Sequence, residues 1–173
     1  MKCPHVVASI MDTVEVHSVL RRTFELEQLS PGQTAAVHAA LAGQDVVVLM
    51  PTGGGKSLCF QLPAVVQTGV SVVICPLVAL ACDQISHMRR LGVNVASYMG
   101  VDDASERRNC LEDHTLKLLY TTPEQMASSA TLQAWLMKMH ASKMLTRIVL
   151  DEAHCVCTWG SGFRYAQQNC AHD

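Results

Sequence analysis

Short apolar runs alternate with amphipathic stretches along most of the chain after residue 30. A short, continuous apolar run is typical of a strand that is buried on both faces. Such runs occur at Asp45–Met50, Ser71–Cys75, Leu116–Thr121 and Thr146–Leu150, and a weaker one occurs at Asn94–Tyr98. Helical patterns fill the intervals at Lys56–Val66, Leu77–Leu91, Ala104–Asp113 and Leu132–Ser142. Because strands that alternate with helices form βαβ units, the pattern predicts an α/β fold, with a mainly parallel sheet and helices on both faces.

The composition is that of a globular protein. A length of 173 residues suits one domain with its own core, and 49% hydrophobic and 16% charged residues exclude a disordered chain. The formal net charge of −2 gives no bulk support for nucleic-acid binding, so that function has to be argued from local motifs. Several of the eight cysteines lie within apolar runs, which favours buried thiols in a reducing compartment over a disulfide framework. No apolar run approaches the roughly 20 residues of a membrane span. We therefore expect a soluble intracellular protein with no membrane partner, located in the nucleus if the cell is eukaryotic and in the cytoplasm otherwise.

A glycine-rich loop follows the first predicted strand, with the sequence Pro51-Thr52-Gly53-Gly54-Gly55-Lys56-Ser57. Glycines allow successive N–H groups to point inward at phosphate oxygens, and the following helix directs its N-terminal donors at the same anion. In this arrangement Lys56 reaches the β- and γ-phosphates, and the hydroxyl of Ser57 binds the Mg²⁺ that bridges them. A strict phosphate-binding motif has Gly where this chain has Met50, and the alternative is a glycine-rich turn with a surface lysine. The strand–loop–helix context favours a site for ATP with Mg²⁺, formed by Thr52, Gly53, Gly54, Gly55, Lys56 and Ser57.

Acidic residues follow the last predicted strand, in the sequence Asp151-Glu152-Ala153-His154. A carboxylate at the tip of a neighbouring buried strand can hold Mg²⁺, which is the role we expect for Asp151. Glu152 is then placed to orient or deprotonate the attacking water, and His154 to link the nucleotide site to neighbouring groups. Such a run alone is often an acidic loop with a helix cap. Together with the phosphate-binding loop it predicts ATP hydrolysis, with Lys56, Asp151, Glu152 and His154 as the catalytic candidates.

These motifs belong to a longer series that resembles the RecQ family of ATP-dependent DNA helicases, DEAH-type members of helicase superfamily two. The resemblance covers roughly residues 24–164. It rests on the segments Met50–Ala64, Pro31-Gly32-Gln33, Cys75–Leu80 with Asp83-Gln84, Tyr120–Glu124 and Asp151–Cys155. It implies a RecA-like P-loop NTPase lobe, the first of the two lobes of such a helicase, in which Gln33 contacts the adenine base.

The resemblance also implies contacts with single-stranded or forked DNA. The segments around Pro76 and Thr122 resemble motifs that lie along DNA in the family, and Cys157–Arg164 is similar to the family's aromatic-rich loop, which couples single-strand binding to ATP hydrolysis. Trp159 and Phe163 offer faces on which bases can stack, and Arg164 adds positive charge. Without the resemblance, burial of both rings in the core is an equal alternative.

This chain also departs from the family pattern. The family usually has Gln, His, Asp and Pro where this chain has Thr158, Ser161, Gly162 and Tyr165, and Arg where it has Ser30. The replacements at 161 and 162 fall in the loop that senses DNA, which puts DNA-stimulated hydrolysis in question.

The resemblance divides the chain into three segments. These are a peripheral helical segment at 1–23, an incomplete first RecA-like lobe at 24–164 and a divergent tail at 165–173. Family members continue with a further strand and with a second RecA-like lobe that supplies an arginine finger. In the RecA-like fold that strand lies between the strand before the phosphate-binding loop and the strand before Asp151. We therefore expect an apparently truncated, N-terminal fragment, in which backbone groups stay unpaired or the two strands pair directly, and whose stability is marginal.

Two functions follow from these motifs. The first is the ATP-binding lobe of a DNA helicase, in which ATP hydrolysis drives translocation on single strands and duplex unwinding once the second lobe is joined to it. The second is a truncated nucleotide- or partner-binding module without catalytic turnover. A P-loop kinase is disfavoured because the acidic and DNA-loop motifs have no role in one.

Overall fold

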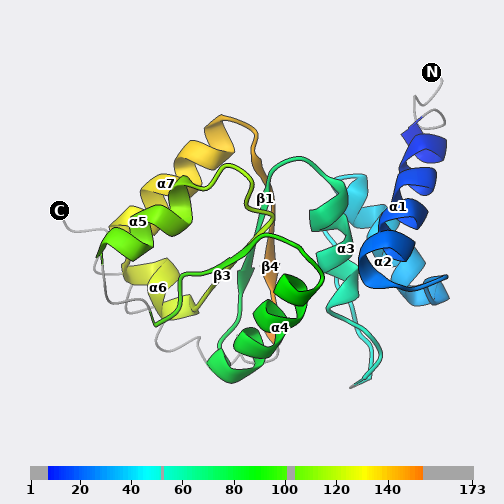
Figure 1. The fold of residues 1–173 in the computed structure, drawn as a ribbon, viewed down its shortest axis with the longest axis horizontal. Coiled ribbons are helices and arrows are strands. Elements are labelled where there is room, and N and C mark those ends of the chain that lie inside the picture. The colour runs from blue at the N-terminus through cyan, green and yellow to red at the C-terminus, as the bar shows by residue number, and fades with distance from the viewer. Residues whose placement is uncertain (1–7, 52, 101–103, 154–173) are drawn as a thin grey trace. The chain divides into compact units, whose positions relative to one another are not determined.

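The computed structural model describes residues 8–51, 53–100 and 104–153. The chain divides into two compact units, Met1–Thr68 with Leu91–Val93 and Gly69–Arg90 with Asn94–Asp173, and each is described by itself. The helices are α1 (Ala8–Phe24), α2 (Pro31–Leu41), α3 (Leu58–Val66), α4 (Val78–Arg90), α5 (Ala104–Glu112), α6 (Pro123–Ser128) and α7 (Ala130–Ala141). The strands are β1 (Val70–Ile74), β2 (Val95–Ser97), β3 (Leu118–Thr121) and β4 (Leu145–Leu150), as Figure 1 shows.

The strands of the second unit form a four-stranded sheet in the order β2-β3-β1-β4. Every neighbouring pair is parallel, and in the register of the central strand Ile74 lies opposite Thr121 of β3 and Leu150 of β4. Parallel neighbours need a crossover connection, which the helices between the strands supply. The predicted parallel α/β sheet is confirmed, and its strands coincide with the last four apolar runs of the sequence.

Helices cover both faces of this sheet. Successive residues of a strand point to opposite faces, so neighbours in β3 mark the two sides. Leu119 packs in a buried cluster with Leu111 of α5 and Leu132 of α7, whereas the hydroxyl of Tyr120 donates a hydrogen bond to Gln84 of α4 at 3.0 Å. Hence α5 and α7 lie on one face and α4 on the other (Figure 1). All residues of β1 are buried, which explains its nearly continuous apolar sequence.

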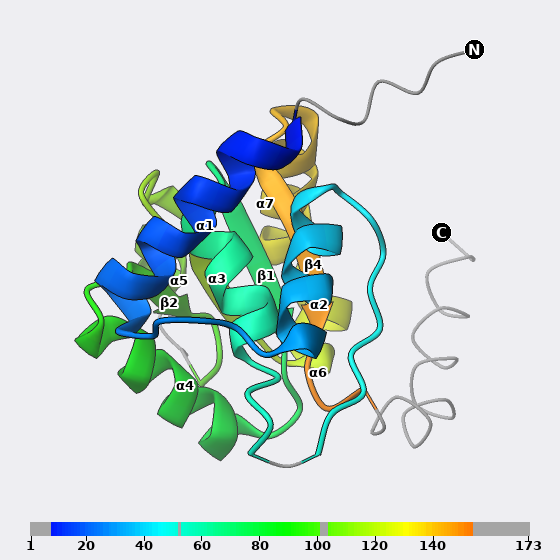
Figure 2. The ribbon, with the colours of Figure 1, turned by 90° about the vertical axis from the view of Figure 1, so that its right-hand side faces the viewer.

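The centre of the first unit is α3, which packs against both α1 and α2 (Figure 2). Its residues Leu58 and Leu62 are buried with Val37 of α2 and with Val16 and Leu20 of α1. The helix predicted near the N-terminus is confirmed by α1, which contributes buried side chains to this cluster. The boundaries of the three predicted segments stay a prediction.

The predicted helices are present, with small changes at their ends. α7 begins earlier than its apolar pattern indicated, because the hydroxyl of Ser129 caps it by accepting from the N–H of Leu132. α4 ends at Arg90, and Gly92 follows with a φ of +74°, a conformation in which glycine commonly terminates a helix. Within the part of the chain that the structure describes, no helix is both long and apolar enough to cross a membrane.

The apolar run Asp45–Met50 is not a strand, so that prediction was wrong. Residues 44–50 have no regular secondary structure, and the side chains of Val47 and Leu49 are 87% and 92% exposed. A strand requires a ladder partner for its N–H and C=O groups. Within the described sheet β4 is an outer strand and pairs with β1 alone, so residues 44–50 have no ladder partner in that sheet. Direct pairing of this run with the strand before Asp151 does not occur among the described residues.

Candidate functional site

The phosphate-binding loop turns tightly between Met50 and α3. The N–H of Gly54 donates to the carbonyl oxygen of Pro51 at 3.0 Å, and Gly53 and Gly55 have φ values of +78° and +74°. Glycine adopts this left-handed conformation without steric cost. A curled, glycine-rich loop in front of a helix is an arrangement that presents N–H groups to an anion.

The ammonium group of Lys56 lies against the carbonyls of its own loop. Its Nζ donates to the carbonyl oxygen of Met50 at 3.1 Å and to that of Pro51 at 3.3 Å. These acceptors are neutral carbonyls, whereas a phosphate oxygen would add the attraction of a negative charge to the hydrogen bond. Lys56 is therefore held at the loop by bonds that a phosphate would replace favourably.

Gln33 joins the start of α2 to the phosphate-binding loop. Its side-chain oxygen accepts from the N–H of Ser30 at 2.9 Å, and its own N–H donates to the hydroxyl of Ser30 at 3.4 Å, which together form a capping box. Its side-chain NH₂ donates to the carbonyl oxygen of Gly55 at 3.3 Å. The amide predicted to read the adenine base is thus already oriented by the helix and by the loop. Ser30, which stands where the family usually has Arg, has a local function as the helix cap.

We expect Ser30→Ala to lower the free energy of unfolding by about 1 kcal/mol, because it removes the side-chain acceptor of the capping box. Urea denaturation of both proteins measures the change. Ser30→Thr keeps a hydroxyl and should retain most of the stability, and Ser86→Ala, on the exposed surface of α4, is the matched control. Equal stability of Ser30→Ala and the unaltered chain would contradict the capping role.

Three predicted site residues follow neighbouring strands of the sheet. Thr122 comes directly after β3, Asp151 comes directly after β4, and Pro76 lies just beyond the end of β1. The ladder continues to these ends, because the N–H of Asp151 donates to the carbonyl oxygen of Ile74 at 3.0 Å. The carboxyl edge of the sheet therefore places Thr122, Pro76 and Asp151 in a row, at the edge where parallel sheets bind ligands.

Pro76 and Thr122 are both half-buried. The hydroxyl of Thr122 caps α6 by accepting from the N–H of Gln125 at 3.3 Å. That hydroxyl keeps its own hydrogen as a donor, so it can both cap the helix and donate to a phosphate oxygen.

The carboxylate of Asp151 is held by hydrogen bonds to both oxygens. Its Oδ1 accepts from the N–H of Glu152 at 3.0 Å, and its Oδ2 accepts from the side-chain NH₂ of Gln84 at 2.8 Å. The side-chain oxygen of Gln84 accepts in turn from the hydroxyl of buried Tyr120. Sequence reasoning quoted Gln84 within a family motif but assigned it no role. The signal that points to it is a half-buried polar side chain on α4, next in sequence to buried Ile85.

The backbone of Glu152 adopts a φ of +53°, which is uncommon for a residue with a side chain. Such conformations cost on the order of 1–3 kcal/mol and cluster at functional sites. The turn that follows β4 is therefore a place where local strain accompanies predicted chemistry. The next predicted residue, His154, lies outside the described residues, as do Thr52, Trp159, Phe163 and Arg164. The roles expected for these five stay predictions.

Asp151 and Ser57 offer the kind of oxygen atoms that Mg²⁺ takes. The ion is usually bound by one or two protein groups, with waters and substrate phosphates completing its shell. Asp151 supplies a carboxylate, and the hydroxyl of Ser57 is not used to cap α3. Nowhere in residues 8–51, 53–100 and 104–153 do three or more His, Cys, Asp or Glu side chains gather around a possible metal position. Taken separately, the carboxylate of Asp151 and the hydroxyl of Ser57 are each the kind of group that binds such an ion.

Burial raises the pKa of the Cys59 thiol, which lies in the first turn of α3. A raised pKa keeps the thiol protonated, and a protonated thiol is a poor nucleophile because the thiolate is the reactive form. Cys59 is therefore a packing residue beside the phosphate-binding loop.

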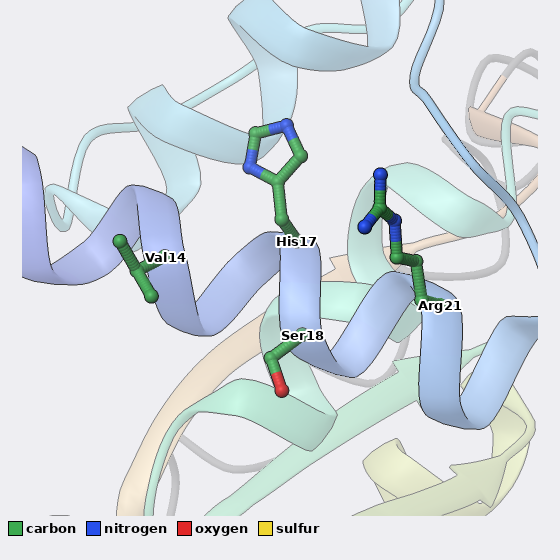
Figure 3. A pocket seen from close by; sticks show the side chains of 4 residues that line it. All are labelled: Val14, His17, Ser18 and Arg21. Atoms are coloured by element: carbon green, nitrogen blue, oxygen red, sulfur yellow. The ribbon is translucent and has the colours of Figure 1, made fainter.

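A hollow along α1 lies apart from all of these motifs. It is lined by Val14, His17, Ser18 and Arg21, which all come from that one helix and point in different directions (Figure 3). The guanidinium of Arg21 contacts the carboxylate of exposed Glu27 at 3.1 Å. None of the lining residues belongs to a predicted site, so we assign the hollow no function.

Comparison with known proteins identifies the family. A family model described as DEAD/DEAH box helicase matches residues 30–172. The chain is 43% identical over 159 residues to the ATP-dependent DNA helicase hus2/rqh1 of Schizosaccharomyces pombe, and the match covers 87% of this chain and 12% of that protein. It is 42% identical over 157 residues to the ATP-dependent helicase SGS1 of Saccharomyces cerevisiae, covering 87% of this chain and 11% of that protein.

A third relative is the RecQ-like DNA helicase BLM of Xenopus laevis, which is 40% identical over 156 residues; the match covers 87% of this chain and 11% of that protein. The chain therefore spans only 11–12% of the length of these three relatives.

A solved structure shares the fold. The crystal structure of a hypothetical ATP-dependent RNA helicase from Sulfolobus tokodaii superposes with a TM-score of 0.61 at 21% identity, and the match covers 88% of this chain and 44% of that chain. At this identity the likeness concerns the fold alone, and it confirms a RecA-like lobe. The chain belongs to the DEAD/DEAH box helicase family, and its curated relatives place it among the RecQ-type members of that family.

Proposed function

We propose that this chain is the ATP-binding lobe of a RecQ-type DNA helicase. The observation that best supports the proposal is the curled loop in front of α3, over which Lys56 is held by two hydrogen bonds to neutral carbonyls. In the whole helicase, ATP hydrolysis would drive translocation along single-stranded DNA and unwinding of the duplex. That work requires the second RecA-like lobe as a partner, so we do not expect this chain to unwind DNA alone.

In the proposed site, the N–H groups of the loop and of the α3 N-terminus bind the phosphate oxygens of ATP. Lys56 exchanges the carbonyls of Met50 and Pro51 for the β- and γ-phosphates. Glu152 orients the attacking water or accepts its proton, and Asp151 and Ser57 hold Mg²⁺. When bound, the ion supplies positive charge that neutralises the phosphates. The remaining proposed roles are adenine recognition by Gln33, phosphate binding by the loop residues Thr52, Gly53, Gly54 and Gly55, and a link to neighbouring groups by His154.

DNA is proposed to lie along the carboxyl edge of the sheet. Pro76 and Thr122 stand at the ends of adjacent strands there, and the loops that carry them lead into α4 and α6. Trp159 and Phe163 are proposed to stack on bases, and Arg164 to contact the backbone. Because Asp151 follows the next strand of the same edge, DNA contact and phosphate chemistry would share one side of the sheet. A nuclear location in a eukaryotic cell is part of this proposal.

A second candidate function is a nucleotide- or partner-binding module without turnover. The observation that favours it is the irregular segment 44–50, which leads into the phosphate-binding loop without the support of a strand. Hydrolysis requires reacting groups to be held far more exactly than binding does. A loop with a loosely supported entrance can therefore retain binding and lose catalysis.

Nucleotide binding by the purified chain tests the proposal. A fluorescent ATP analogue is titrated with Mg²⁺ present and again with EDTA, and phosphate release is then followed with and without single-stranded DNA. Saturable binding that Mg²⁺ strengthens is the expected result, and phosphate release that DNA stimulates favours the helicase lobe over the module. Binding without any DNA-stimulated release favours the module. A chain that melts cooperatively and binds no nucleotide contradicts the proposed ATP site.

A further inference from the structure

Three polar side chains of the second unit form one hydrogen-bonded chain. The hydroxyl of Tyr120, on β3, donates to the side-chain oxygen of Gln84, on α4, at 3.0 Å. The NH₂ group of the same amide donates to Oδ2 of Asp151, at the end of β4, at 2.8 Å. Tyr120 is fully buried, whereas Gln84 and Asp151 are half-buried. The chain of bonds therefore runs from the interior to the carboxyl edge of the sheet.

These bonds have one self-consistent direction. An ionised carboxylate only accepts hydrogen bonds, so Gln84 must turn its NH₂ group toward Asp151. The amide oxygen then faces Tyr120, whose buried hydroxyl donates to it. The carboxylate therefore decides which end of the amide faces it, and the bond from Tyr120 helps to hold the amide of Gln84 in place against Asp151.

The remaining bonds of Asp151 leave its charge available. Its N–H donates to the carbonyl oxygen of Ile74, and its Oδ1 accepts from the N–H of Glu152. Each carboxylate oxygen thus has a donor here and keeps capacity for a further partner. Gln84 is neutral, so it orients the carboxylate without neutralising it. A Lys or Arg in its place would compete with a cation for the same negative charge.

We propose that Gln84 is the positioning residue of Asp151 and holds its carboxylate in the orientation that binds the Mg²⁺ of the bound nucleotide. The inference rests on the proposed function, in which Asp151 binds that ion. Removing a residue that orients a metal ligand typically weakens metal binding about 10–100-fold. The elements that carry Gln84 and Tyr120 are connected to the proposed DNA loops, because α4 follows the Pro76 loop and β3 leads into Thr122.

The test uses the full chain with Gln84→Met, which keeps the side-chain length and removes both hydrogen bonds. Tyr120→Phe, which keeps the ring and removes only the hydroxyl, is the second variant. Ser86→Ala, at an exposed position of the same helix, is the control. For each protein, binding of the fluorescent ATP analogue is measured in EDTA and at increasing Mg²⁺, and a thermal melt checks the fold.

Mg²⁺ is expected to strengthen nucleotide binding, and the Mg²⁺ concentration that gives half of this effect should rise by about 10-fold or more in Gln84→Met. The affinity of the same variant for the nucleotide in EDTA should change by less than about twofold. Tyr120→Phe should give a smaller rise in the same direction, and Ser86→Ala none. A general structural role would instead weaken binding equally in EDTA and in Mg²⁺, and that result overturns the inference. An unchanged Mg²⁺ requirement in Gln84→Met overturns it as well. If the unaltered chain binds no nucleotide, or binds it equally well with and without Mg²⁺, the result contradicts the proposed ATP–Mg²⁺ site itself. The inference about Gln84 is then contradicted together with the proposed function.

Discussion

Lys56→Ala is expected to weaken binding of ATP with Mg²⁺ by about 100-fold, because a hydrogen bond to a charged group contributes up to about 3 kcal/mol and each 1.4 kcal/mol is roughly tenfold in affinity. The ammonium lies at the loop, held by the carbonyl oxygens of Met50 and Pro51. It therefore needs little rearrangement to reach a phosphate. Titration of a fluorescent ATP analogue measures the loss.

The fold should survive this substitution. The two bonds that Lys56 makes have neutral acceptors and are part-buried or exposed, so their loss should cost about 1 kcal/mol and lower the melting temperature by roughly 2–4 °C. Lys138→Ala, at an exposed position in the last turn of α7, is the matched control and should bind nucleotide normally. Undiminished binding by Lys56→Ala would show that the glycine-rich loop is not the phosphate site.

Gly69→Ala is expected to destabilise the second unit by on the order of 3 kcal/mol, from backbone strain and overpacking together. Gly69 directly precedes β1 and has a φ of +111°, which residues with a side chain rarely adopt. An added Cβ would overlap the carbonyl oxygen of Met144 and lie 3.0 Å from Cγ2 of Thr146. That carbonyl already accepts from the N–H of Val70 at 2.8 Å, where β1 and β4 begin to pair. A thermal melt should show a decrease of about 6–12 °C.

Gly100→Ala separates the two causes. Gly100 also has a positive φ, +65°, but a Cβ there would meet no other atom within 4 Å. It should cost only the backbone strain, on the order of 1 kcal/mol, with a decrease in melting temperature of roughly 2–4 °C. Similar melting temperatures for the two variants would contradict a steric role for the β1–β4 junction.

Much of the fold was predictable because the buried positions of each element recur along the sequence with the spacing of that element. β1 is covered on both faces, and its residues are almost all apolar for that reason. The helix α4 buries Ala81, Ile85 and Met88, which recur at helical spacing along its sequence. The curl of the glycine-rich loop was predictable because only glycine takes positive φ freely, and Gly53 and Gly55 do so.

The sequence also allowed the prediction that the residues following the strands lie at one edge of the sheet. Parallel strands bring their carboxyl ends to one edge, so residues that follow β1, β3 and β4 must lie near each other there. The partners of Asp151 were not predictable in this way. Gln84 and Asp151 are 67 positions apart, and no local pattern links them. Only the packing of α4 over the sheet brings the amide to the carboxylate.

The sequence by itself determined which stretches tend to be helical or extended, the curled glycine-rich loop and the membership of the DEAD/DEAH box helicase family. These depend on propensity, periodicity and motif spacing, which are local properties. The tertiary structure alone decided that Asp45–Met50 forms no strand, although it is as apolar as β1. It alone decided that Tyr120 and Gln84 hold Asp151. The reason is the same in both cases: a ladder and a hydrogen bond each need a partner from elsewhere in the chain, and only the folded chain supplies or withholds it.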